Sequence, residues 1–158
     1  MLAHDLLLQY RQSATTNALW NRNLCRLLNE RPDLGGDRLY RILQHMLAAD
    51  EVWLARFDGC DPDLACLQWT QCARPDEIWF RRLEMDEEIV RTVSAYSGPE
   101  LAKPISYHDF RGTLQHEALG TCLARLFNHQ QNHQFRIDDN LRRELESDDQ
   151  DWNCLHYF

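Results

Sequence analysis

Residues 126–137 have the sequence LFNHQQNHQFRI, and this stretch does most to decide the fold. His129 and His133 are four residues apart, so on a helix their imidazoles lie on one face, about one 5.4 Å turn from each other. Steps of three and four residues away from this pair reach apolar or small side chains, namely Leu119, Cys122, Leu126, Ile137 and Leu141. The pattern predicts a long helix, from about 113 to 145, with two histidines in its buried stripe.

Three further helices are predicted before this one, because apolar residues recur at helical spacing between segments rich in Gly and Pro. The first covers about 2–29 and ends at the sequence RPDLGG. The second begins at Asp37, a suitable N-cap residue, and ends near 57, before DGCDPD. The third begins near Pro75, since Pro is tolerated in a first turn, and ends at the Ser-Gly-Pro of 97–99.

The segments between the predicted helices are short. Residues 64–74 are expected to form a connector that packs on the helices, and 105–113, rich in β-branched and aromatic residues, to form a strand or short hairpin. Nothing alternates strand with helix, so the sequence predicts an all-α, single-domain four-helix bundle over 1–146. Residues 147–158, with the sequence SDDQDWNCLHYF, are expected to form an acidic and aromatic C-terminal tail.

Charge and composition narrow the function. A net charge of −8 argues against nucleic acid as a partner, because phosphate binding needs clustered Lys and Arg. The arginines are instead expected on solvated helix faces, as in the pairs Arg22 and Arg26, Arg81 and Arg82, Arg142 and Arg143. No apolar stretch is long enough to cross a bilayer, and the first residues do not resemble a signal peptide, so we expect a cytoplasmic protein.

The six cysteines do not form a recognisable site. They are scattered, without a CxxC pair, which argues against a zinc ribbon and against a disulfide-stapled secreted domain. We expect most of them to be reduced packing residues, including Cys122 on the stripe that holds the histidines.

His45 provides a third histidine on an apolar helix face. Steps of three and four residues from it reach Ile42, Ala49 and Val52, and the small residues Ala48 and Ala49 leave space one turn later. A single histidine on such a face is more often a hydrogen-bonded core residue than a ligand, and an HxxxH spacing arises readily by chance. Three inward histidines from two helices favour a shared divalent metal, although hydrogen bonding or a position at the open end of the bundle would also explain them.

Three segments together resemble the DinB/YfiT-like family of four-helix-bundle proteins. HMLAADEVWLARF, residues 45–57, is similar to the family's second-helix motif, and LFNHQQNHQFRI to the last-helix motif NHxxHHRGQ. ALWNRNLCRLL, residues 18–28, is similar to its N-terminal WxNxxL pattern. The resemblance implies metal ligands at His45, His129 and His133, zinc or nickel as the metal, a homodimer, and relatives that include metal-dependent hydrolases and bacillithiol- or mycothiol-dependent transferases. The family's Arg-Gly-Gln is absent here, where Gln134, Phe135 and Arg136 follow His133.

Three neutral imidazoles leave a coordination position for water or a substrate, as in catalytic rather than structural zinc sites. The sequence therefore predicts either a metal-dependent hydrolase or a thiol-dependent S-transferase acting on a low-molecular-weight thiol or another small molecule. The alternatives are a non-catalytic metal-binding or stress-response module, and a helical scaffold without a metal. No catalytic residue is assigned. His116 and Glu51 are candidates for contacts with the ligands or the substrate. For Glu51 the alternative is a solvated position on the surface, which is also what we expect for Asp50.

Overall fold

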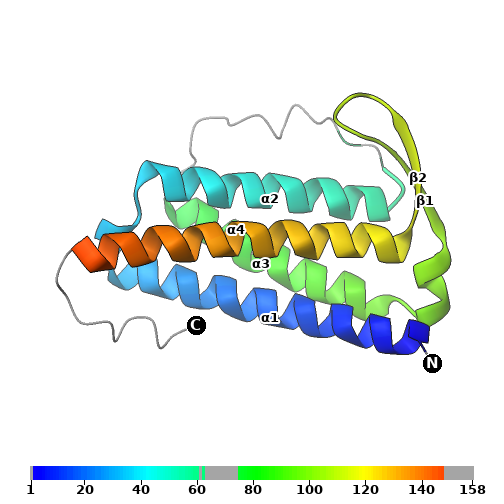
Figure 1. The fold of residues 1–158 in the computed structure, drawn as a ribbon, viewed down its shortest axis with the longest axis horizontal. Coiled ribbons are helices and arrows are strands. Elements are labelled where there is room, and N and C mark those ends of the chain that lie inside the picture. Colours follow the sequence, from blue (N-terminus) through cyan, green and yellow to red (C-terminus); the bar gives the residue numbers. More distant parts are fainter. Residues whose placement is uncertain (1, 61, 63–74, 148–158) are drawn as a thin grey trace.

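A computed structural model describes residues 2–60, 62 and 75–147 of the chain (Figure 1). In this part of the chain four long α-helices lie side by side: α1 (Leu2–Glu30), α2 (Asp37–Phe57), α3 (Pro75–Ala95) and α4 (Leu119–Ser147). A short 3-10 helix, η1 (Pro32–Leu34), joins α1 to α2, and another, η3 (Gly98–Ala102), follows α3. The predicted, predominantly helical fold is confirmed. The predicted connector 64–74 and the tail from 148 onward lie outside the described residues.

The helices run in two opposite directions, in two pairs. α1 and α4 run from the hairpin end to the opposite end, where η1 lies, and α2 and α3 run the other way (Figure 1). α2 packs against both α3 and α4, and α1 packs against α3 and α4. Because α2 and α4 are antiparallel, the N-terminal part of α2 lies beside the C-terminal part of α4.

A small antiparallel hairpin of β1 (Pro104–His108) and β2 (Leu114–Ala118) precedes α4, and its register pairs Ser106 with His116. The hairpin is longer than predicted, and α4 begins at Leu119 rather than near 113. Residues 114–118 have helical composition, but pairing with β1 places them in a strand. The side chain of Asp109 organises the turn by accepting hydrogen bonds from the backbone N–H groups of Arg111 and Thr113.

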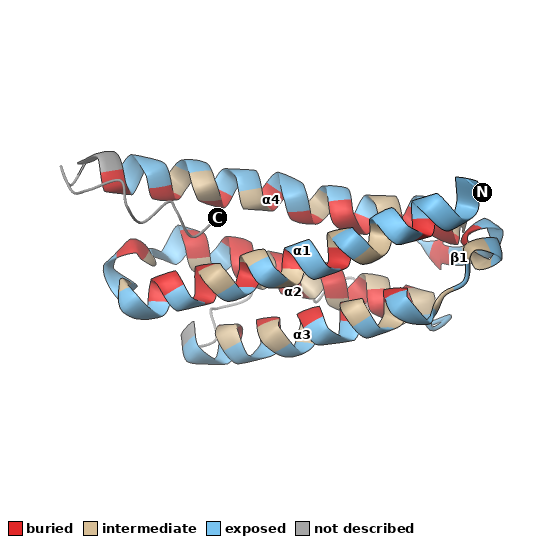
Figure 2. Cartoon of the chain, turned by 90° about the horizontal axis from the view of Figure 1, so that it is seen from below, coloured by how far each residue is buried: buried red, intermediate tan, exposed pale blue. Residues whose placement is uncertain are grey.

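The buried residues of the helices lie mostly on the sides that face the other helices, and the outward sides are mostly exposed (Figure 2). Two apolar clusters fill the interior. The cluster near η1 includes Leu28, Leu43 and Ile137, and the cluster near the hairpin includes Leu54 and Leu123. No helix in the described part of the chain is long and apolar enough to cross a membrane.

A buried polar layer separates the two apolar clusters. All four helices contribute to it at the point where their stripe passes from one cluster to the other, through Asn17, Asn21, Asp50, Arg82, Asp86, Gln130 and His133. Buried polar groups destabilise the fold unless they are hydrogen-bonded, so each side chain in this layer is expected to have a hydrogen-bonding partner.

Candidate metal centre

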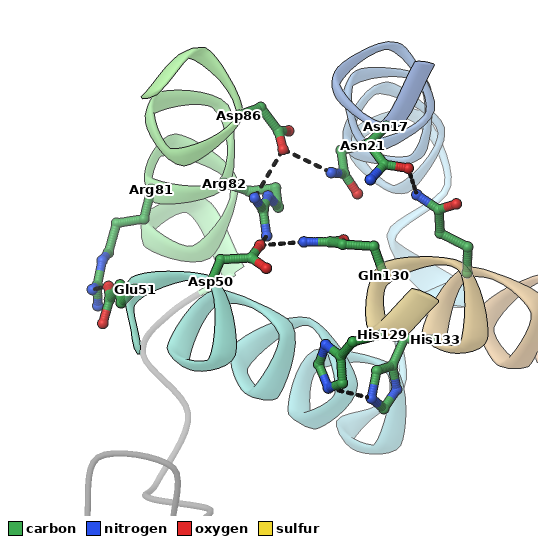
Figure 3. Close-up of polar contacts among 11 residues, drawn as sticks. Asn17, Asn21, Asp50, Glu51, Arg81, Arg82, Asp86, His129, Gln130 and His133 are labelled. Carbon is green, nitrogen blue, oxygen red and sulfur yellow. Dashed lines mark hydrogen bonds and ion pairs between the residues drawn. The ribbon is translucent and has the colours of Figure 1, made fainter. Parts of the chain in front are cut away.

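The three histidines predicted from the sequence lie together beside the polar layer. His129 and His133 lie on one face of α4 and point towards α2 (Figure 3), and His45 lies on the facing side of α2. His133 is buried, and His45 and His129 are half-buried. In the described part of the chain they are the one group of His, Cys, Asp or Glu side chains with ligand atoms close enough to share an ion.

The ring nitrogens of the three histidines lie close to one another. His129 Nε2 lies 3.1 Å from His45 Nε2 and 3.1 Å from His133 Nε2, and the potential ligand atoms of all three residues lie within 4.8 Å of one another. With zinc–nitrogen bonds of 2.0–2.1 Å and tetrahedral angles, two ligating nitrogens are about 3.3 Å apart. The two separations of 3.1 Å are close to this value, so the three histidines lie near enough to one another to bind a divalent ion.

Hydrogen bonding alone accounts poorly for the same contacts. The Nε2 atom of a neutral imidazole carries either one hydrogen or one lone pair, not both. His129 Nε2 therefore cannot form two good hydrogen bonds, one to each neighbouring ring nitrogen. An ion would accept one lone pair from each of the three nitrogens, which satisfies all of them at once.

The surroundings keep the histidines neutral. Burial lowers the pKa of His129 to about 4, and the positive charges that His133, His45 and Arg136 carry when protonated add to the effect. Burial, followed by the charges of His45 and Arg136, also lowers the pKa of His133 to about 4. The pKa of His45 is lowered for the same reasons, burial first and then Arg136. Neutral imidazole is the form that binds metal, so the site needs no proton release near pH 7.

The polar layer begins one residue away from His129. Gln130 donates a hydrogen bond from its side-chain amide to Asp50 of α2, which in turn accepts one from Arg82 of α3 at 2.6 Å (Figure 3). Arg82 also donates to Asp86 at 2.8 Å, and Asn21 of α1 donates to the same Asp86 oxygen at 2.9 Å. The network connects all four helices and fixes the position of α4 relative to α2 beside the histidines.

The polar layer corrects two expectations from the sequence. Asp50 is fully buried rather than a solvated surface acid, and Arg82 is fully buried rather than on a solvated helix face. Both are tolerated in the interior because they neutralise each other and share further hydrogen bonds. The sequence contained a signal for the burial of Arg82, because it lies at helical spacing with the core residues Ile78, Ile89 and Val93 of α3.

The two remaining candidates lie outside the histidine cluster. Glu51 forms an ion pair with Arg81 of α3 and lies away from His129 and His133 (Figure 3). His116 is exposed on β2, where its Nδ1 lies 2.8 Å from the hydroxyl of Ser106. Neither residue belongs to the group that could share an ion. Among the cysteines that the structure describes, Cys25 and Cys122 are buried as predicted, and Cys60 is exposed.

A surface pocket of about 530 Å³ opens beside the histidines, towards the η1 end of the molecule. Arg41 and Ile42 precede His45 by one turn on α2, and Arg136 follows His133 by three residues on α4. Since the two helices are antiparallel, these residues lie on the same side of the histidines, and Asp37 and Arg38 complete the lining.

Comparisons of the whole chain with protein families, with curated proteins and with solved structures find no match. The functional argument therefore depends on the site itself.

Proposed function

We propose that this chain is a divalent-metal protein, with His45, His129 and His133 as ligands, in a four-helix bundle of the DinB/YfiT type. We further propose that it acts as a metal-dependent hydrolase or thiol-dependent S-transferase. The observation that carries the proposal is the proximity of the three Nε2 atoms, with His129 Nε2 3.1 Å from each of the other two. The donor set of three neutral imidazoles suits zinc or nickel.

A divalent ion in this site would supply a Lewis acid and would lower the pKa of a bound water or thiol. The residues of the chain contribute positioning. α4 presents two ligands on one turn, α2 presents the third, and the hydrogen bond from Gln130 to Asp50 holds the two helices together next to the ligands. The partial exposure of His45 and His129 leaves the site accessible to a small molecule from one side.

The second candidate function is metal binding without turnover. The observation in its favour is that Glu51, the acidic candidate from the sequence, is engaged with Arg81 and lies away from the histidines. The absence of the family's Arg-Gly-Gln after His133 points the same way. In this case the metal would stabilise the helices or a homodimer rather than activate a substrate.

Elemental mass spectrometry of untagged protein tests metal binding. We expect close to one zinc or nickel ion per chain in the wild type, and loss of the ion in His45→Ala, His129→Ala and His133→Ala. His116→Ala is the matched control, because it removes an exposed histidine on the hairpin and should leave the metal content unchanged. A wild-type protein that takes up neither zinc nor nickel would exclude the proposed site.

Turnover separates the two candidate functions. The metal-loaded protein would be incubated with activated esters and, separately, with a thiol and an electrophilic acceptor, and His129→Ala would be the inactive reference. Metal-dependent turnover in the wild type supports the enzyme. A fully loaded protein that converts neither class of substrate faster than His129→Ala supports the non-catalytic alternative.

A further inference from the structure

The pocket beside the histidines carries an unusual concentration of positive charge. Arg38 and Arg41 of α2 and Arg136 of α4 line it, with Asp37 as the one acidic residue and Ile42 as an apolar wall. Three arginines and one aspartate give a local formal charge of +2, whereas the whole chain carries −8. A positive pocket on a strongly acidic protein is a feature that charge composition alone does not explain.

These arginines are not engaged by carboxylates in the described part of the chain. The ion pairs there involve Arg31, Arg81, Arg82, Lys103, Arg125 and Arg143, and none of the three pocket arginines. All three side chains are exposed, so their planar guanidinium groups are available to a ligand. Arginine presents paired N–H donors that match the geometry of carboxylate and phosphate groups.

The first turn of α2 adds to the same field. The helix begins at Asp37, its N-cap residue Gly36 provides no side-chain acceptor, and Arg38 and Arg41 project from the first turns. The free N–H groups of a helix N-terminus carry a partial positive charge that favours anions. The negative charge of Asp37 offsets part of this positive potential, but the pocket has three arginines and one aspartate, so its net charge stays positive.

The pocket is also close to the candidate metal centre. Arg41 and Arg136 are each about one 5.4 Å turn from a metal-ligand histidine along their helix. Three neutral ligands leave the charge of a divalent ion uncompensated, so an anion held at this distance would also be favoured by the ion.

We propose that Arg38, Arg41 and Arg136 form a subsite for the carboxylate or phosphate group of a small anionic molecule, one helical turn from the three histidines. The volume of about 530 Å³ lies in the range of small-molecule sites. Anion binding itself needs only the arginines. The role of the anion as the handle of a substrate whose other end reaches the histidines rests on the function proposed above.

Isothermal titration calorimetry on the full chain, stripped of metal with EDTA and at constant ionic strength, tests the subsite. Inorganic phosphate and glutarate are titrated separately, so that the two arms show which type of anion is preferred. We expect Arg136→Gln to weaken binding of the preferred anion roughly tenfold, the effect of one charge-assisted hydrogen bond. The double variant Arg41→Gln/Arg136→Gln should abolish measurable binding.

Two matched variants make the test specific. Arg91→Gln removes an exposed arginine that lines a different recess, between α1 and α3, and should leave the affinity unchanged. His129→Ala should bind the anion as the wild type does. The subsite is rejected if neither anion binds, if Arg91→Gln weakens binding as much as Arg136→Gln, or if His129→Ala abolishes it. A failure of the proposed metal site would give a different result: the wild type would bind no metal but would still bind the anion, and this binding would depend on the arginines.

Discussion

The shifted histidines make the stability of the metal-free protein depend on pH. Burial lowers the pKa of His129 and His133 from 6.5 to about 4. Between these values the unfolded chain binds more protons than the native chain, so the free energy of unfolding decreases as the pH falls. Their contribution is intact above about pH 6.5 and is lost as the pH approaches 4. Asp50 acts in the opposite direction, because burial raises its pKa from 3.8 to about 6.

A comparison of variants isolates the histidine contribution from that of Asp50. We expect the wild type to lose stability relative to His129→Leu as the pH is lowered from 7 to 5, in urea unfolding curves recorded with EDTA. His116→Leu is the matched variant, because it removes a histidine that lies outside the cluster. A difference between the wild type and His129→Leu that does not change with pH would show that His129 is not shielded from water.

Arg82 has the largest expected effect on stability among the single charges. It is fully buried between Asp50 and Asp86, so Arg82→Met leaves two buried carboxylates without their partner. We expect a loss of about 3–5 kcal/mol in the free energy of unfolding at pH 7. Arg81→Met, one position away in the exposed pair with Glu51, should cost about 1 kcal/mol or less. Equal losses in denaturant titrations would contradict the buried network.

At this scale the sequence predicted the histidine cluster and missed the network beside it. His129 and His133 lie on the apolar stripe of one helix and His45 on that of another, so all three were expected to point into the bundle. Asp50 and Arg82 also lie on the core stripes of their helices, but charged residues are rarely buried unless paired. The ion pair between Asp50 and Arg82 joins two different helices, so only the tertiary structure reveals it.

Among the secondary-structure elements, the helices were the easiest to predict. Periodic apolar residues and the breakers between them indicate α1, α2 and α3 to within a few residues. The start of α4 was predicted too early, because the pairing of β2 with β1 overrides the helical composition of residues 114–118. Strand pairing depends on contacts with another segment, which local composition does not report.

The antiparallel arrangement of α2 and α4 explains how the candidate site is assembled. It places Arg41 and Arg136 on the same side of the histidines although they are far apart in sequence. The hydrogen bond from Gln130 to Asp50 is buried next to His129, and it fixes the distance between the two helices. Sequence patterns identify each face separately, and the relative direction of the helices is needed to combine them.

At the scale of the whole molecule, metal binding should couple to global stability. The three proposed ligands come from two helices, and His45 and His129 are 84 residues apart in sequence, so the site exists only in the folded chain. A ligand that binds only the native state at 100 times its dissociation constant adds about 2.7 kcal/mol. For a domain of this size that corresponds to a rise in Tm of roughly 5–10 °C.

Thermal unfolding with and without zinc or nickel measures this coupling. The rise should be present in the wild type and in His116→Ala, and absent in His45→Ala, His129→Ala and His133→Ala. The six cysteines give the unfolded chain an affinity for zinc of its own, which reduces the rise with zinc more than with nickel. A decrease in Tm with both metals would mean that the ions bind the unfolded chain in preference to the three histidines. A rise that survives in all three histidine variants would place the metal at a different site.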